Sequence, residues 1–263
     1  MATQQQQQSY FQYYVKGGIS GMFGVFLSHP VDTVKTHIQT GKPFSTFNPT
    51  IKNFYRGFTS PFIGVCVEKA IVFGTYNYFL KQTDNIPISG GISGLTASFI
   101  VTPYERLKIL KQNSQIFKMS DIDFRFLFKG LSTTFTREVP GFAIYFTTYE
   151  ALKYHTFTKH GQQIEYINSF VYGGISGIMS WIFIYPQDRI KTIIQSQTYF
   201  NNNNTKSTSN FKNVAKQLWA NGGIVNLYKG FSWALARATL LHSGTFCMME
   251  ILNTNNIFDN FTF

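Results

Sequence analysis

One pattern of proline, acid, base and glutamine occurs three times in this sequence with the same spacing. In each copy the acid follows the proline by two residues, the base by five and the glutamine by nine. The copies are Pro30, Asp32, Lys35 and Gln39; Pro103, Glu105, Lys108 and Gln112; and Pro186, Asp188, Lys191 and Gln195. Carboxylates and ammonium groups in such a pattern form ion pairs. The repeat predicts three similar structural units within one domain.

A glycine motif precedes each copy, and it indicates the helices that carry the charges. Gly-Gly-Ile-Ser-Gly occupies residues 17–21, 90–94 and 173–177. Small residues four positions apart let helices approach closely in a membrane. The sequence predicts helices over Tyr13–Gln39, Ile86–Gln112 and Ile167–Gln195. Pro30, Pro103 and Pro186 should kink them, which is tolerated where a neighbour satisfies the freed carbonyl.

A second set of helices is indicated by an aromatic residue, a base and a glycine. This signal ends at Gly57, Gly130 and Gly230, and the apolar segments reach Asn77, Glu150 and Glu250. Each segment ends 20 residues after its glycine, a length that suits one bilayer crossing. An aromatic residue beside a cation is typical of a membrane interface. Six spans are therefore expected.

The composition agrees with a membrane protein but does not establish one. Charged residues make up 13% of the chain and aromatic residues 17%, against about 25% charged residues in soluble domains. No uninterrupted run of 18 apolar residues exists. The net charge of +11 is compatible with nucleic acid, anionic lipid or a cavity for anionic solutes. The basic residues are scattered singly, which disfavours nucleic acid.

These patterns predict an all-α membrane protein with six transmembrane helices in three pseudo-symmetric repeats around a central cavity. We expect a disordered glutamine-rich tail over residues 1–12 and repeats over 13–82, 83–158 and 159–263, all in one domain. The insertion Asn201–Asn204 should be a solvated loop. Phe211–Asn221 should form a short amphipathic surface helix, with weaker equivalents near Asn53 and Asp121.

The three acids and bases allow two pairing schemes. Asp32 and Lys35 are close enough on one helix to pair locally. Alternatively, each acid reaches the base of the next unit in a ring, and the ring closes one mouth of the cavity. The ring pairs would be Asp32 with Lys108, Glu105 with Lys191, and Asp188 with Lys35. Such a ring can open when ligand contacts compensate for the broken pairs, and it would then act as a gate.

The three copies match Pro-x-Asp/Glu-x-x-Lys/Arg, and in this the chain resembles the mitochondrial carrier family over nearly its whole length. The resemblance implies a carrier of the inner mitochondrial membrane that alternates between two facing states. It implies that the charged ring is the matrix gate, that Gln39, Gln112 and Gln195 brace it, and that the short surface helices lie on the matrix side.

The family's second gate, on the cytoplasmic side, is matched fully at one place, by Tyr149, Glu150 and Lys153. The equivalent segment Tyr76-Asn77 lacks the acid. Met249-Glu250 lacks the aromatic residue and ends in Asn253 instead of a base. The resemblance therefore implies a weak cytoplasmic gate.

Charged residues at mid-membrane depth are the candidate substrate-binding residues. They are Glu68, Arg137, Glu138 and Arg237. Charges in spans are functional candidates by default, although they can also pair with one another as fixed structural contacts. An arginine followed by an acid in the fourth helix resembles the amino-acid and carnitine branches, and Glu68 resembles the basic amino-acid carriers. Lys69 follows Glu68 and would neutralise it if both faced the cavity.

We therefore expect an exchanger of basic amino acids such as ornithine, arginine or lysine. Two alternatives remain open: a carnitine/acylcarnitine carrier, and a non-transporting membrane scaffold. No enzyme activity, cofactor or metal is expected, because the five histidines show no spacing suited to such chemistry. The expected partners are a small-molecule substrate and membrane lipid, with cardiolipin as one candidate, and the protein should be monomeric and bind no nucleic acid.

Overall fold

The computed structural model describes residues 2–39, 50–55, 58–112, 128, 131–160, 166–200, 211–220, 222–228 and 230–255. Within these residues every regular element is a helix. Six are long: α1 (Ala2–Gln39), α3 (Thr59–Thr83), α4 (Ile86–Gln112), α6 (Leu131–His160), α7 (Tyr166–Phe200) and α10 (Phe231–Thr254). Three are short: α2 (Ile51–Phe54), α8 (Phe211–Ala220) and α9 (Gly223–Leu227).

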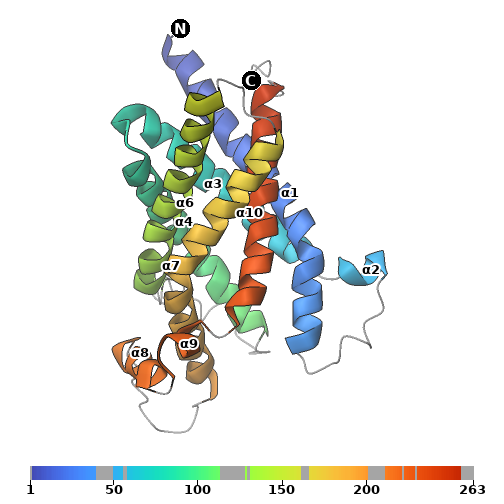
Figure 1. The fold of residues 1–263 in the computed structure, drawn as a ribbon, viewed down its shortest axis with the longest axis vertical. Coiled ribbons are helices and arrows are strands. Elements are labelled where there is room, and N and C mark those ends of the chain that lie inside the picture. Colours follow the sequence, from blue (N-terminus) through green and yellow to red (C-terminus); the bar gives the residue numbers. More distant parts are fainter. Residues whose placement is uncertain are drawn as a thin grey trace, which may run out of the picture.

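The six long helices form a closed ring. Each one packs against the next long helix along the chain, and α10 packs back against α1. Among the described residues, the backbones of long helices that are not neighbours in the ring do not approach each other closely, so these helices meet only through side chains. The short helices α8 and α9 lie at the end of the ring away from the two chain ends (Figure 1). Such a ring leaves an interior that side chains must either fill or line.

Most helix starts follow the sequence signals closely, but α1 begins earlier than expected, and α6 and α7 end later than expected, at His160 and Phe200. α4 has the expected bounds, and α3, α6 and α10 begin within two residues of their signal glycine. Helix α1, however, begins at Ala2 and includes the glutamine tract, where a disordered tail was expected. Glutamine is a good helix former, so the tract continues the helix that follows it. The segment near Asp121 lies outside the described residues.

The turn between α3 and α4 shows how local chemistry sets one helix boundary. Asp84 adopts the left-handed conformation at φ 48°, which ends α3. The side chain of Asn85 then accepts a hydrogen bond from the Ile88 N–H at 3.1 Å and caps α4.

Prolines interrupt the backbone hydrogen bonds of four long helices, among them α6 at Pro140, and two of the freed carbonyls have side-chain partners. Pro30 lies in α1, Pro103 in α4 and Pro186 in α7, and Figure 1 shows α1 and α7 changing direction along their length. The carbonyl oxygen four residues before a proline loses its helical donor. The hydroxyl of Tyr55 donates to Phe26 O at 3.1 Å, and that of Tyr228 donates to Ile182 O at 2.6 Å.

The glycine motifs let the same backbone contact recur in three helix pairs. A Cβ on the first glycine of each motif would lie 2.6–2.8 Å from a backbone carbonyl oxygen of the facing helix. The contacts join Gly17 to Lys69, Gly90 to Phe142, and Gly173 to His242. Any side chain would force these helices apart. Lys69, Phe142 and His242 each stand twelve residues after a signal glycine.

The outside of the ring is apolar, whereas its helix interfaces carry serines. Helix α7 exposes Val171, Ile175, Met179 and Phe183, and α4 exposes Phe99. Ser98 and Ser176 are buried and donate to backbone carbonyls of their own helices at 2.7 Å. Large exposed apolar faces with small residues inside are typical of a protein surrounded by lipid.

By length and hydropathy, two stretches of the described residues are apolar enough to cross a membrane, Ile86–Tyr104 and Tyr166–Ile190. The other long helices carry charged or strongly polar residues, such as Lys69 and Arg137, that lower their hydropathy.

Candidate functional site

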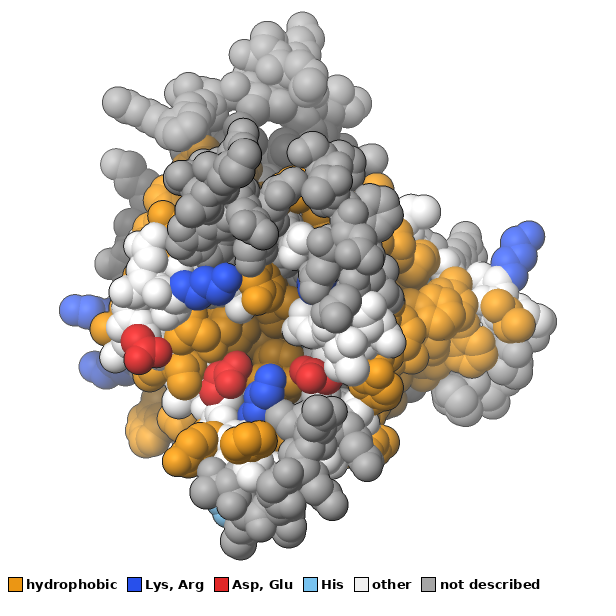
Figure 2. Space-filling model, turned by 90° about the horizontal axis from the view of Figure 1, so that it is seen from above, with side chains coloured by type: hydrophobic (Ala, Val, Ile, Leu, Met, Phe, Trp, Pro, Cys, Tyr) orange, Lys and Arg blue, Asp and Glu red, His pale blue; other side chains and the backbone are white. Residues whose placement is uncertain are grey.

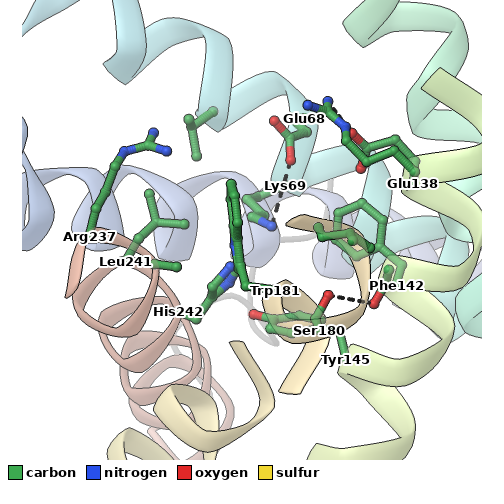
Figure 3. A pocket seen from close by; sticks show the side chains of 15 residues that line it. Glu68, Lys69, Glu138, Phe142, Tyr145, Ser180, Trp181, Arg237, Leu241 and His242 are labelled. Atoms are coloured by element: carbon green, nitrogen blue, oxygen red, sulfur yellow. Dashed lines mark hydrogen bonds and ion pairs between the residues drawn. The ribbon is translucent and has the colours of Figure 1, made fainter. Parts of the chain in front are cut away.

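A cavity of about 210 Å³ lies inside the ring between α3, α6, α7 and α10. Its lining includes all four residues that the sequence indicated as substrate-binding candidates: Glu68, Arg137, Glu138 and Arg237 (Figure 3). These residues lie on three different helices, so the fold alone brings them together. Two acids and two arginines around one small cavity can bind solutes that carry charges of both signs.

The two arginines of the cavity are paired with acids of the neighbouring long helices. A terminal nitrogen of Arg137 donates to Asp188 on α7 at 2.9 Å, and the same guanidinium pairs with Glu138 beside it. Nε of Arg237 on α10 donates to Asp32 on α1 at 2.8 Å. All these side chains are partly buried, so solvent screens the pairs only partly.

This pairing joins two sets of residues that the sequence assigned to different roles. Asp32 and Asp188 are two of the predicted gate acids, yet both contact arginines of the cavity. The remaining gate and brace side chains lie outside the described residues, and the expected ring of pairs stays a prediction. These are Lys35, Glu105, Lys108, Lys191, Gln39, Gln112 and Gln195.

Lys69 faces the cavity together with Glu68, which is the case in which the sequence predicted that it would neutralise the acid. Its side chain is 2% exposed, and its ammonium lies 3.6 Å from the Glu68 carboxylate. The ammonium also lies 4.8 Å from the ring centroid of Phe142 and 5.4 Å from that of Tyr145. These distances correspond to cation–π contacts. Lys69 therefore offsets part of the Glu68 charge and occupies the faces of two aromatic rings.

Two further polar residues of the cavity were missed by sequence reasoning. Tyr145 and His242 are both buried, and their ring centroids are 4.8 Å apart. Neither Tyr145 Oη nor His242 Nδ1 makes a hydrogen bond to a described protein atom. A buried polar atom left in this state costs about 1–3 kcal/mol. A signal for His242 did exist, since it occupies the same repeat position as Lys69.

An aromatic cluster closes the ring beside the cavity, on the side of the chain ends. Tyr76 stacks on Phe146 with centroids 3.7 Å apart, and Tyr149 stacks on Phe246 at 3.5 Å. Phe73 meets both phenylalanines edge to face. All five residues are buried and come from α3, α6 and α10. The stacking seals this half of the interior.

The predicted second gate lies at the aromatic cluster and beyond it. Tyr149 belongs to the cluster and donates a hydrogen bond to Ser169 at 3.2 Å. Lys153 pairs with Glu250 on α10 at 4.0 Å, and Glu150 is partly buried. Glu250, the acid of a segment that lacks the aromatic residue and the base of the motif, thus takes part in an ion pair at this end. Seen from this end, acidic and basic side chains surround a hollow floored by hydrophobic side chains (Figure 2).

An apolar exterior, a closed ring of helices and a charged interior cavity together define a membrane transport protein. The family model for "Mitochondrial carrier protein" matches residues 6–86, 119–160 and 162–258. The chain therefore belongs to the mitochondrial carrier family, whose members are multi-pass proteins of the inner mitochondrial membrane. The expected family and localisation are confirmed.

Curated relatives with different substrates are similar to this chain to nearly the same degree. The human mitochondrial carnitine/acylcarnitine carrier protein is 30% identical over 95% of this chain and 96% of its own length. Mitochondrial ornithine transporter 1 of Saccharomyces cerevisiae is 27% identical over 91% and 94%. The mitochondrial glycine transporter YMC1 of the same yeast is 28% identical over 89% and 88%. Identity at this level does not select a substrate.

Proposed function

We propose that this protein is a six-span, threefold pseudo-symmetric carrier that exchanges basic amino acids by alternating access. The observation that carries the proposal is the placement of Glu68 and Glu138 around one cavity with Arg137 and Arg237. A basic amino acid carries two ammonium groups and one carboxylate. Two acids and a cationic partner match those charges, and charge-assisted hydrogen bonds give the selectivity.

The paired arginines suggest how binding and gating are connected. Asp32 and Asp188 belong to the proposed matrix gate, and in this state Arg237 and Arg137 hold them. The aromatic cluster closes the opposite half. We infer a state open toward the matrix, in which two of the proposed gate acids are held by the arginines of the cavity. A change of facing state would then alter the contacts between these acids and arginines, and a bound solute could shift that balance.

The carnitine alternative is supported by a separate observation. The carnitine/acylcarnitine relatives are 30% identical to this chain over almost its full length. Carnitine carries one carboxylate and one quaternary ammonium, so it needs only one acid of the cavity. The aromatic faces that favour a quaternary ammonium, however, are occupied by Lys69. For that reason we place basic amino acids first.

Exchange in proteoliposomes tests the proposal. Liposomes loaded with L-ornithine should take up labelled L-ornithine, and Glu68→Gln or Glu138→Gln should each lower the rate by about ten- to a hundredfold. Asp84→Asn is the matched control, because it removes an exposed acid from the α3–α4 turn, where asparagine tolerates the left-handed conformation. Exchange of L-carnitine without L-ornithine would establish the alternative, and exchange of no metabolite would favour the scaffold reading.

A further inference from the structure

We propose that the floor of the cavity is an anion subsite in which Lys69, Tyr145 and His242 receive the carboxylate of the transported solute. This inference deepens the proposed function and rests on it. It moves the carboxylate away from Arg137 and Arg237, the cations that charge alone would choose. The three floor residues come from α3, α6 and α10, so a bound carboxylate would touch three helices at once.

The arginines are poor candidates for the carboxylate because protein acids already hold them. Arg237 pairs with Asp32 at 2.8 Å, and Arg137 pairs with both Asp188 and Glu138. A solute carboxylate would have to displace one carboxylate with another. Replacing a protein carboxylate by a solute carboxylate gains little, because the displaced protein acid would stay on its helix without its arginine.

The floor, in contrast, offers donors that lack acceptors. Tyr145 is 1% exposed and His242 is 8% exposed, and both line the cavity. Tyr145 Oη and His242 Nδ1 make no hydrogen bond to any described protein atom. With its proton on Nδ1, His242 donates as Tyr145 does. A carboxylate oxygen is the acceptor that satisfies two such donors best.

Lys69 supplies the charge for this subsite and excludes a cation from it. Its ammonium lies over the rings of Phe142 and Tyr145 and lies 3.6 Å from Glu68, which is longer than an ordinary hydrogen bond. Three donors on one ammonium leave room for a second acceptor. Because the protein's own cation covers the aromatic faces, the ammonium groups of the solute are directed to Glu68 and Glu138. Figure 3 shows Lys69, Tyr145 and His242 converging on the same side of the cavity.

Thermal unfolding of the purified full chain tests the subsite without requiring transport. At constant ionic strength, acetate should raise the unfolding temperature of the wild type, and acetamide, its neutral analogue, should not. Lys69→Gln and Tyr145→Phe should each weaken apparent acetate binding by about tenfold, because each removes a charge-assisted hydrogen bond. Tyr76→Phe is the matched control. It also removes a buried hydroxyl without a described partner, but one outside the cavity.

A second comparison uses candidate solutes with and without the carboxylate. L-ornithine should stabilise the wild type more than putrescine, and L-carnitine more than choline, and Tyr145→Phe should reduce whichever difference the wild type shows. Equal stabilisation by acetate in wild type, Lys69→Gln and Tyr145→Phe would overturn the subsite. So would loss of the acetate effect in Arg237→Gln alone. If acetate binds as expected but liposomes exchange no solute, the subsite stands and the proposed function fails.

Discussion

Arg237 and Asp32 are separated by 205 positions in the sequence, yet Nε of the arginine lies 2.8 Å from the carboxylate. The pair joins the last long helix to the first and thereby closes the ring. It also connects a residue of the cavity to an acid of the proposed gate. The same connection recurs between Arg137 and Asp188. In the proposed function, binding and gating therefore share side chains.

The Asp32–Arg237 pair should behave as one unit. Asp32→Asn and Arg237→Gln should each lower the exchange rate by about tenfold or more, because each breaks a partly buried charge pair. The double variant should be no slower than either single one, since the pair can be lost only once. Initial exchange rates in proteoliposomes, corrected for the amount of inserted protein, measure this. Losses that multiply in the double variant would show that the two residues act independently.

A lysine at position 137 should not be able to take over the function of Arg137. Arg137 holds Asp188 and Glu138 with separate nitrogens, and a lysine ammonium cannot reproduce that planar fork. Arg137→Lys should therefore slow exchange by about tenfold. The control is Arg189→Lys, since Nε of Arg189 makes no hydrogen bond to a described protein atom. This variant should keep a rate close to that of the wild type. Equal effects of both substitutions would contradict the role of Arg137.

Two neighbouring glycines of α4 should respond oppositely to alanine. A Cβ at Gly94 would lie 2.4 Å from the carbonyl oxygen of Glu138, whereas at Gly91 its nearest contact is 3.6 Å from a methyl of Val139. Gly94→Ala should destabilise the protein by about 1–3 kcal/mol through overpacking. Gly91→Ala should be neutral or gain up to about 1 kcal/mol from helix propensity. Thermal unfolding in detergent compares the two, and a more stable Gly94→Ala would refute the close contact.

The tyrosine hydroxyls at the proline kinks should contribute to stability. Tyr228→Phe removes the donor to Ile182 O, the carbonyl that Pro186 frees, and should cost about 1 kcal/mol. Tyr55→Phe should do the same at Pro30. Tyr78→Phe, which alters an exposed tyrosine of α3 away from both kinks, provides the comparison for thermal unfolding. If both kink variants unfold at the wild-type temperature, water or lipid satisfies these carbonyls equally well.

Much of the fold was predictable because local signals repeat in the chain. The spacing of Pro30, Pro103 and Pro186 and the glycines at 57, 130 and 230 predicted six long helices and the starts of five of them to within two residues. These signals act within a few residues of backbone, so they need no tertiary partner. The glutamine tract was assigned wrongly, because its composition resembles disorder while its position continues a helix.

The sequence by itself determined the family, the helical ring and the identity of the charged residues in the cavity. Each of these follows from residue types at fixed spacing. Only the tertiary structure decided which charges meet, because partners on different helices are chosen by packing. The fold placed Arg237 and Arg137 against Asp32 and Asp188, and spacing along the chain did not indicate these two contacts. It likewise turned Lys69 inward and left Tyr145 and His242 with buried donors at the cavity floor.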